Sequence, residues 1–127
     1  TAQASLELLS LAGIDNLGKK SSKLTAYFIE LFDALYMEKY GLSIVTPRDE
    51  SRRGTHISLA HEESYGISQA LIAGRVIPDF RPPDMVRHGL VAAYISFRDV
   101  FDSMMRLNEI MNRKIYEQHR ERKGLVT

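Results

Sequence analysis

The chain has 127 residues, which is enough for one domain, and carries a formal net charge of +1. Hydrophobic residues make up 44% and charged residues 26%, which excludes a disordered or collagen-like chain. The small net charge argues against nucleic acid as a partner, and the absence of a long apolar run argues against a membrane. Because the chain has no cysteine, it has no disulfide, thiolate nucleophile or cysteine-based zinc site, which suits a reducing compartment.

The first third of the sequence is predicted to be helical. A short first helix ends at Gly13, and Asp15 is expected to cap the second. The second helix spans about residues 16–39, and Tyr40-Gly41 is expected to end it. Its apolar side chains recur at the spacing of one helical face, and they are Leu24, Tyr27, Phe28, Leu31, Phe32, Leu35 and Tyr36.

The middle of the chain is predicted to alternate between strands and a helix. Apolar patterning indicates strands at residues 42–45 and 55–60, separated by a charged loop. A third helix runs from His61 to Gly74, and a further strand begins at Val76. Prolines are expected to break the chain into turns after that point, namely Pro78, Pro82 and Pro83.

The end of the chain holds the clearest helix. Residues 85–91 are expected to form a last strand, after which Ser96 and Asp99 resemble a capping box. The helix that they open carries one apolar stripe and fades after Ile115. These elements predict an α+β domain over residues 1–127, with a small three- to four-stranded, mostly antiparallel sheet. Helices, including a long N-terminal and a long C-terminal one, are expected to cover one face of that sheet.

The usual motifs of metal sites and of nucleophilic catalysis are absent from the sequence. The histidines have no i, i+4 pair and no HExxH, and they are His56, His61, His88 and His119. There is neither a glycine-rich phosphate loop nor a GxSxG motif. Ser58 and His56 fall on the same side of one predicted strand, but they lack a third orienting group. We therefore expect no metal, and we expect the histidines to be surface or capping residues.

Arginines are the residues that most suggest binding. One loop holds Arg48, Arg52 and Arg53, which form either a solvated rim paired with nearby acids or a site for an anion. Arg87 differs because it lies within the apolar run Met85–Val91. A charge among buried neighbours needs a partner. The residues leave two alternatives open for Arg87, an internal acid or a ligand carboxylate.

Longer motifs resemble one enzyme family. Residues 44–59 (IVTPRDESRRGTHISL) and residues 70–87 (ALIAGRVIPDFRPPDMVR) match the patterns of kynureninases, as does the sequence around Tyr94 and Phe97. The resemblance covers roughly residues 12–113. It implies a pyridoxal-phosphate enzyme of the aspartate-aminotransferase fold type, which hydrolyses kynurenine or 3-hydroxykynurenine to anthranilate or 3-hydroxyanthranilate and alanine. The family's place is the kynurenine pathway of tryptophan catabolism, which leads to NAD biosynthesis.

The resemblance further implies that this chain is only the C-terminal small domain, without the cofactor-binding large domain. We then expect no catalytic and no cofactor-binding residue here, and an inactive domain when it is alone. The six lysines are expected to face solvent rather than to form a Schiff base, and they are Lys19, Lys20, Lys23, Lys39, Lys114 and Lys123. The implied partners are an amino-acid substrate, the chain's own large domain and a second copy in a cytoplasmic homodimer.

Only a few residue roles follow from the resemblance. Arg87 matches the family's arginine for the substrate α-carboxylate, and Arg81 matches a recurrent position that we expect to be structural. His88 stands where bacterial relatives often have Phe, so it lies either at the edge of the pocket or in the core. A cysteine desulfurase or aminotransferase relative of the same fold type is the alternative enzyme. The alternative outside the enzymes is a non-catalytic anion-binding module.

Overall fold

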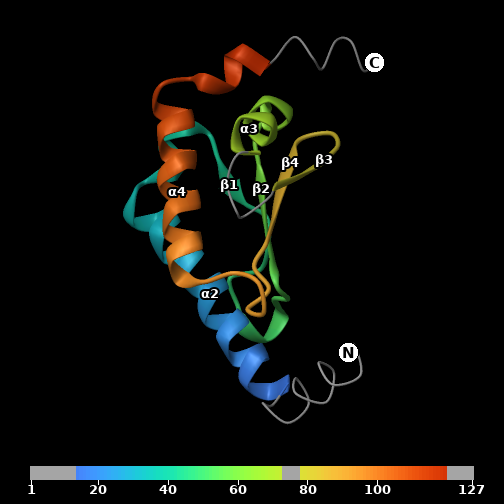
Figure 1. Cartoon of the computed structure of the whole chain (residues 1–127). Coiled ribbons are helices and arrows are strands. Elements are labelled where there is room, and N and C mark those ends of the chain that lie inside the picture. Colours follow the sequence, from blue (N-terminus) through green and yellow to red (C-terminus); the bar gives the residue numbers. More distant parts are fainter. Residues whose placement is uncertain (1–13, 73–77, 120–127) are drawn as a thin grey trace, which may run out of the picture.

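The structure is a computed structural model that describes residues 14–72 and 78–119, with side chains from residue 18 onward (Figure 1). Its α-helices are α2 (Ile14–Ala34), α3 (Ser64–Leu71) and α4 (Phe97–Asn112). Its strands are β1 (Ser43–Ile44), β2 (His56–Ala60), β3 (Pro78–Arg81) and β4 (Met85–Gly89). Short 3-10 helices are η1 (Met37–Tyr40), η2 (Glu50–Arg52) and η3 (Ile115–His119).

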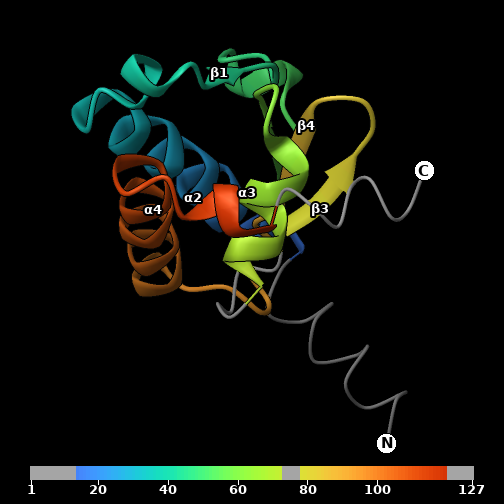
Figure 2. The ribbon, with the colours of Figure 1, turned by 90° about the horizontal axis from the view of Figure 1, so that it is seen from above.

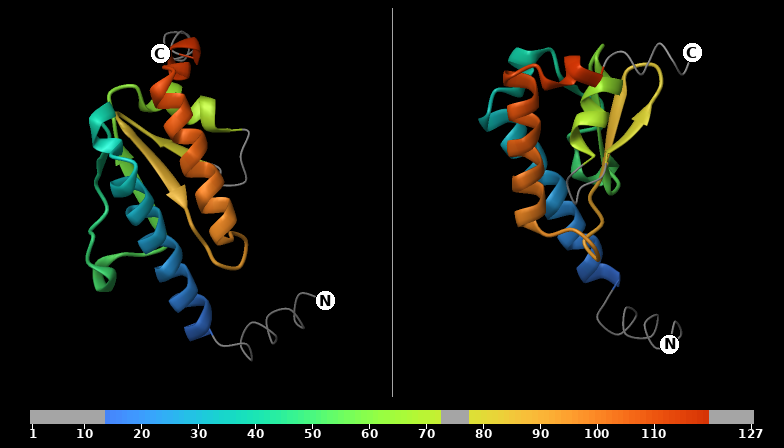
Figure 3. Two further views of the ribbon diagram at one scale, coloured as in Figure 1. Left: turned by 90° about the vertical axis from the view of Figure 1, so that its left-hand side faces the viewer. Right: turned by 45° about the horizontal axis from the view of Figure 1, so that its top comes forward.

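The strands form one four-stranded antiparallel sheet in the order β1-β2-β4-β3. The helices α2 and α4 lie side by side against one face of this sheet (Figures 2 and 3). The helix α3 packs near β3 and β4, where the ring of Tyr65 meets that of Phe80 edge to face. The predicted α+β class, with helices over one face of a small antiparallel sheet, is confirmed.

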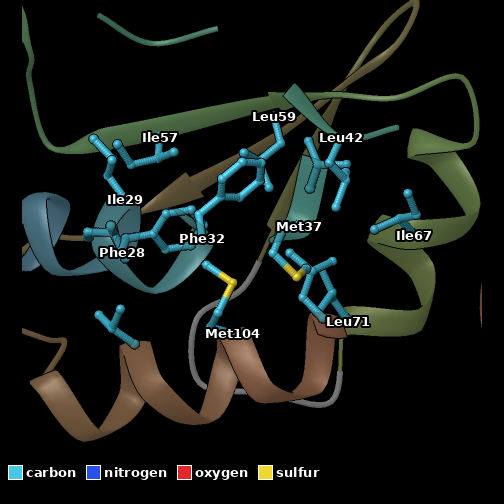
Figure 4. Packing of buried hydrophobic residues seen from close by; sticks show 14 of the residues in the cluster. Phe28, Ile29, Phe32, Met37, Leu42, Ile57, Leu59, Ile67, Leu71 and Met104 are labelled. Atoms are coloured by element: carbon cyan, nitrogen blue, oxygen red, sulfur yellow. The ribbon is translucent and has the colours of Figure 1, made fainter. Parts of the chain in front are cut away.

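The core lies between the sheet and the two long helices (Figure 4). Phe28 and Phe32 of α2 and Met104 of α4 point towards Ile57 and Leu59 of β2, and each of these side chains is at most 1% exposed. Burying one such side chain fully stabilises a fold by about 1.5–3 kcal/mol. The predicted apolar faces of the second and last helices are therefore the faces that build the core.

The helix α2 ends earlier than the sequence predicts. Tyr36 adopts a left-handed backbone conformation with φ of 53°, so that α2 ends at Ala34 and its last helical hydrogen bond runs from the Leu35 N–H to the Leu31 carbonyl oxygen. The chain continues as η1, and it is η1 that Gly41 ends, at φ of 86°. The prediction of one helix to residue 39 was wrong because it placed the stop at the glycine, whereas a tyrosine already takes the left-handed conformation that L-residues usually avoid.

The start of α2 also differs from the prediction. The helix begins at Ile14, so Asp15 lies inside its first turn rather than at the capping position. The expected first helix, which ends at Gly13, lies outside the described residues. The same holds for Gly74 and Val76, where a helix end and a strand start were expected.

The third strand contradicts the expectation that the prolines make only turns. Pro78 is the first residue of β3, which pairs with β4 from Pro78 to Arg81. This strand is at the edge of the sheet, where the missing N–H of proline costs no ladder hydrogen bond. The turn to β4 holds Pro82 and Pro83, joined by a cis peptide bond.

The capping box of α4 is confirmed. The Ser96 side chain accepts a hydrogen bond from the Asp99 backbone N–H, and the Asp99 carboxylate accepts one from the Ser96 N–H. The helix ends at Asn112, three residues before the predicted fade at Ile115. The chain then turns at Lys114, and η3 returns to pack on α3.

The contact between α3 and η3 depends on a glycine. A Cβ added to Gly66 would lie 2.6 Å from the carbonyl oxygen of Tyr116. We expect Gly66→Ala to displace η3 and to lower the free energy of unfolding by about 1–3 kcal/mol. Urea denaturation measures this change.

Gly18 offers the matched control, because it lies exposed within α2 with no atom within 4 Å of an added Cβ. Gly18→Ala is expected to raise the free energy of unfolding by about 0.5–1 kcal/mol, since alanine favours helix. A Gly66→Ala protein as stable as the parent would contradict the close approach of η3.

Candidate functional site

The sheet face that α2 and α4 leave uncovered carries three charged side chains. In the register, Arg87 of β4 stands opposite Ser58 of β2 on one side and opposite Asp79 of β3 on the other. Arg81 lies two residues after Asp79, and residues two apart on a strand share a face. We call the surface formed by Asp79, Arg81 and Arg87 the arginine face.

A single oxygen holds the arginine face together. Oδ2 of Asp79 lies 2.8 Å from Nη2 of Arg81 and 3.0 Å from Nη2 of Arg87. The Arg87 side chain is 34% exposed, and those of Asp79 and Arg81 are 50% and 49% exposed. Two guanidinium groups thus share one carboxylate, and the cluster keeps one positive charge.

This geometry bears on the two alternatives left open for Arg87. The internal acid exists and is Asp79, but it reaches Arg87 through one N–H only. Nε and Nη1 of Arg87 have no hydrogen-bond partner among the described residues. An arginine with unused N–H donors, in a cluster of net positive charge, can bind a second carboxylate.

His88 lies on the other side of the same strand. It stands opposite Ile57 on the helix-covered face, is 0% exposed, and its ring lies 5.1 Å from that of Phe28. Neither ring nitrogen has a hydrogen-bond partner in the described part of the chain. Burial lowers its pKa from 6.5 to about 4. Of the two alternatives for His88, this position fits the core residue and not the pocket edge.

Two of the three loop arginines, Arg48 and Arg53, form hydrogen bonds to side chains of α2. Arg48 donates from both Nη atoms to the two carboxylate oxygens of Asp33, at 2.8 and 3.0 Å. These hydrogen bonds lower the pKa of Asp33 and raise that of Arg48. Arg53 donates to Thr25 Oγ1 and to the Arg48 carbonyl oxygen. The acid that pairs with Arg48 thus lies on α2 and not in the loop itself.

His61 has a structural position. Its Nδ1 accepts a hydrogen bond from the backbone N–H of Glu63, which leaves Nε2 to donate to the carbonyl oxygen of Tyr40 at 2.9 Å. It thereby joins the start of α3 to η1. His56 lies exposed on the sheet, so these two residues fit the expected capping and surface roles.

Lysines in the described part of the chain are all exposed, as predicted for Lys19, Lys20, Lys23, Lys39 and Lys114. Lys123 lies outside that part. A lysine that forms a Schiff base is usually desolvated to lower its pKa, and none of these five is. The described residues also contain no group of three or more His, Cys, Asp or Glu that could hold a metal ion. No helix in them is long and apolar enough to cross a membrane.

Comparison with known proteins agrees with the sequence motifs. A family model described as the kynureninase C-terminal domain matches residues 17–107. The chain belongs to this family. The arginine face falls within the matched residues, as does every residue of the described core except Ile110 and Met111.

Individual relatives are bacterial kynureninases. The chain is 38% identical over 122 residues to the kynureninase of Geobacillus thermodenitrificans and 39% identical over 122 residues to that of Bacillus thuringiensis subsp. konkukian. It is 37% identical over 116 residues to the kynureninase of Pseudomonas fluorescens. These matches cover 96%, 96% and 91% of this chain. The chain spans 28% of the length of each of these relatives.

Burial of the His88 imidazole predicts how the stability of the fold depends on pH. Because the pKa of His88 is about 4 when folded and 6.5 in its ordinary state, the unfolded chain binds more protons between these values. The contribution of His88 to the free energy of unfolding is complete above pH 6.5. It falls by about 1.4 kcal/mol for each pH unit as the pH drops from 6.5 towards 4. We expect His88→Phe to remove this component, which urea denaturation at pH 7.5 and pH 5 measures.

His56→Gln is the control for this prediction, because it removes an exposed histidine from the same sheet. It is expected to keep the pH dependence of the parent. An unchanged pH dependence in His88→Phe would mean that His88 is not held neutral in the core.

Proposed function

We propose that the protein containing this chain is a kynureninase-type hydrolase that depends on pyridoxal phosphate. Its substrate would be kynurenine or 3-hydroxykynurenine, and its products anthranilate or 3-hydroxyanthranilate and alanine, in the kynurenine pathway of tryptophan catabolism towards NAD. The observation that carries this proposal is the family match over residues 17–107, which includes the partly exposed arginine face.

In this proposal Arg87 binds the α-carboxylate of the substrate. A guanidinium binds a carboxylate through parallel N–H bonds, which fix its orientation as well as its position. Arg87 sits on a strand that is paired on both sides, so its backbone is held firmly. Orienting the amino acid in this way lowers the entropic part of the barrier, because the bond that reacts is already aligned.

Pyridoxal phosphate supplies an electron sink for reactions at the carbon atoms of an amino acid. The described residues do not fit the attachment of this cofactor, because every described lysine is exposed. We therefore assign the cofactor to the large domain that the relatives' greater length allows. The part left to this chain is to bind and orient the substrate.

The same proposal places the large domain and a second copy of the protein against this chain, in the cytoplasm. Exposed apolar side chains in the loop after β4 and in the first turns of α4 support a covered surface there, since such patches usually contact other surfaces. They are Val91, Tyr94, Phe97 and Phe101. The anion-binding module is not favoured, because Arg48 and Arg53 are engaged by α2.

Replacing Arg87 tests the proposed function directly. In the full-length protein, Arg87→Ala is expected to lower kcat/KM for kynurenine by about 100-fold or more, since a charged partner of the substrate is lost. Anthranilate fluorescence measures the rate. Arg98→Ala, which removes an 80% exposed arginine on α4, is the control and should leave the rate unchanged. Parent-like activity of Arg87→Ala would refute the assignment.

The chain by itself gives a second test. With pyridoxal phosphate and kynurenine added, residues 1–127 alone should produce no anthranilate, because no described lysine is placed to form a Schiff base. Clear turnover by the chain would contradict the proposal. A full-length protein that acts on cysteine and not on kynurenine would favour the desulfurase alternative.

A further inference from the structure

Two arginines share the carboxylate of Asp79, whereas the carboxylate of Asp33 forms both of its hydrogen bonds with the single arginine Arg48. Asp33 uses both oxygens to bind both Nη atoms of Arg48. Asp79 instead offers the same oxygen to two arginines, and its contact to Arg81 is the shorter, 2.8 Å against 3.0 Å. Arg87 therefore donates one hydrogen bond to its carboxylate, whereas Arg48 donates two.

Arg81 accounts for this difference. A carboxylate facing one arginine favours the two-bond arrangement, whereas Oδ2 of Asp79 accepts a hydrogen bond from Arg87 and also forms an ion pair with Arg81 at 2.8 Å. We infer that Arg81 is a positioning residue: it holds Asp79 and thereby keeps Arg87 available to an external carboxylate. The inference rests on the proposed function, in which that carboxylate belongs to the substrate.

Strand geometry makes the sharing a built feature of the fold. Asp79 and Arg81 are two residues apart on β3, about 7 Å along the strand, and Arg87 stands directly across from Asp79 on β4. The carboxylate thus lies between two cations held by the backbone of one hairpin. Within the described residues no other carboxylate lies within 4.0 Å of Arg87 or Arg81.

Counting charges gives the direction of each effect. The parent cluster has two positive charges and one negative. Without Arg81, both oxygens of Asp79 can accept hydrogen bonds from Arg87 and neutralise its charge, so a ligand carboxylate binds more weakly. Without Asp79, both arginines are free and the ligand binds more tightly. Without both, Arg87 stands alone with its full charge, and binding returns at least to the parent level.

The experiment measures carboxylate binding at Arg87 in the full-length protein freed of cofactor. Sodium acetate is titrated at fixed ionic strength, and the NMR signal of the Arg87 Nε–H is followed, assigned by its loss in Arg87→Lys. Arg81→Gln is expected to weaken acetate binding by about two- to fivefold, a size typical of exposed pairs. Asp79→Asn is expected to strengthen it by a similar factor, and the double variant to bind at least as tightly as the parent.

Two controls separate this mechanism from simpler ones. Arg48→Gln removes the same charge from an arginine that pairs with Asp33, and it should leave acetate binding at the parent level. Arg81→Lys keeps a cation beside Asp79 and should also bind as the parent does. Far-ultraviolet circular dichroism checks that each variant is folded. An Arg48→Gln effect equal to that of Arg81→Gln would reduce the inference to overall charge and overturn it.

The remaining outcomes also decide the question. Acetate affinity that is equal in the parent and in Arg81→Gln, or that stays low in the double variant, would overturn the role of Arg81. So would the absence of any acetate effect on Arg87. Kynurenine turnover by the holoenzyme is measured separately: the expected order of affinities without turnover would uphold the inference and refute the proposed function, and turnover without that order would do the reverse.

Discussion

The alternation of side chains along β4 is the constraint on which the rest of the structure depends. The adjacent residues Arg87 and His88 of β4 point to opposite faces of the sheet. Arg87 is partly exposed and His88 is fully buried. Antiparallel pairing on both sides fixes which residue takes which face. A register shift of one residue would exchange them and would bury a guanidinium against Phe28, at a cost far larger than that of a neutral imidazole.

The covering of one face by helices sets the chemistry of each side. Beneath α2 and α4 the dielectric is low, so His88 is held neutral, with no hydrogen-bond partner among the described residues. On the arginine face water screens the charges, so Asp79 can serve two guanidinium groups at once without a large penalty. The same strand therefore contributes a buried residue to the core on one side and a partly exposed arginine on the other.

The sequence predicted the parts of the fold that are governed by local and periodic signals. The capping box at Ser96, the apolar stripe of α4 and the strand ending at Ala60 depend on neighbouring residues, and all are present. It failed where tertiary structure overrides local preference. Tyr36 takes a left-handed conformation that no residue signal announces, and Pro78 enters a strand because β4 offers a partner at the edge of the sheet.

The candidate site shows the same division. Arg87 was identified from its apolar surroundings and from family motifs. Asp79 was considered only as one of several acids that could pair with surface arginines, and it was not assigned to Arg87, because eight positions and a turn separate the two. The available signal was the hairpin itself: a strand pair folded about Pro82 and Pro83 brings these two positions together. Cross-strand partners follow from register, and register follows from which face is buried. The position of Arg87 on the uncovered face, beside Asp79, is thus set by the packing of the opposite face.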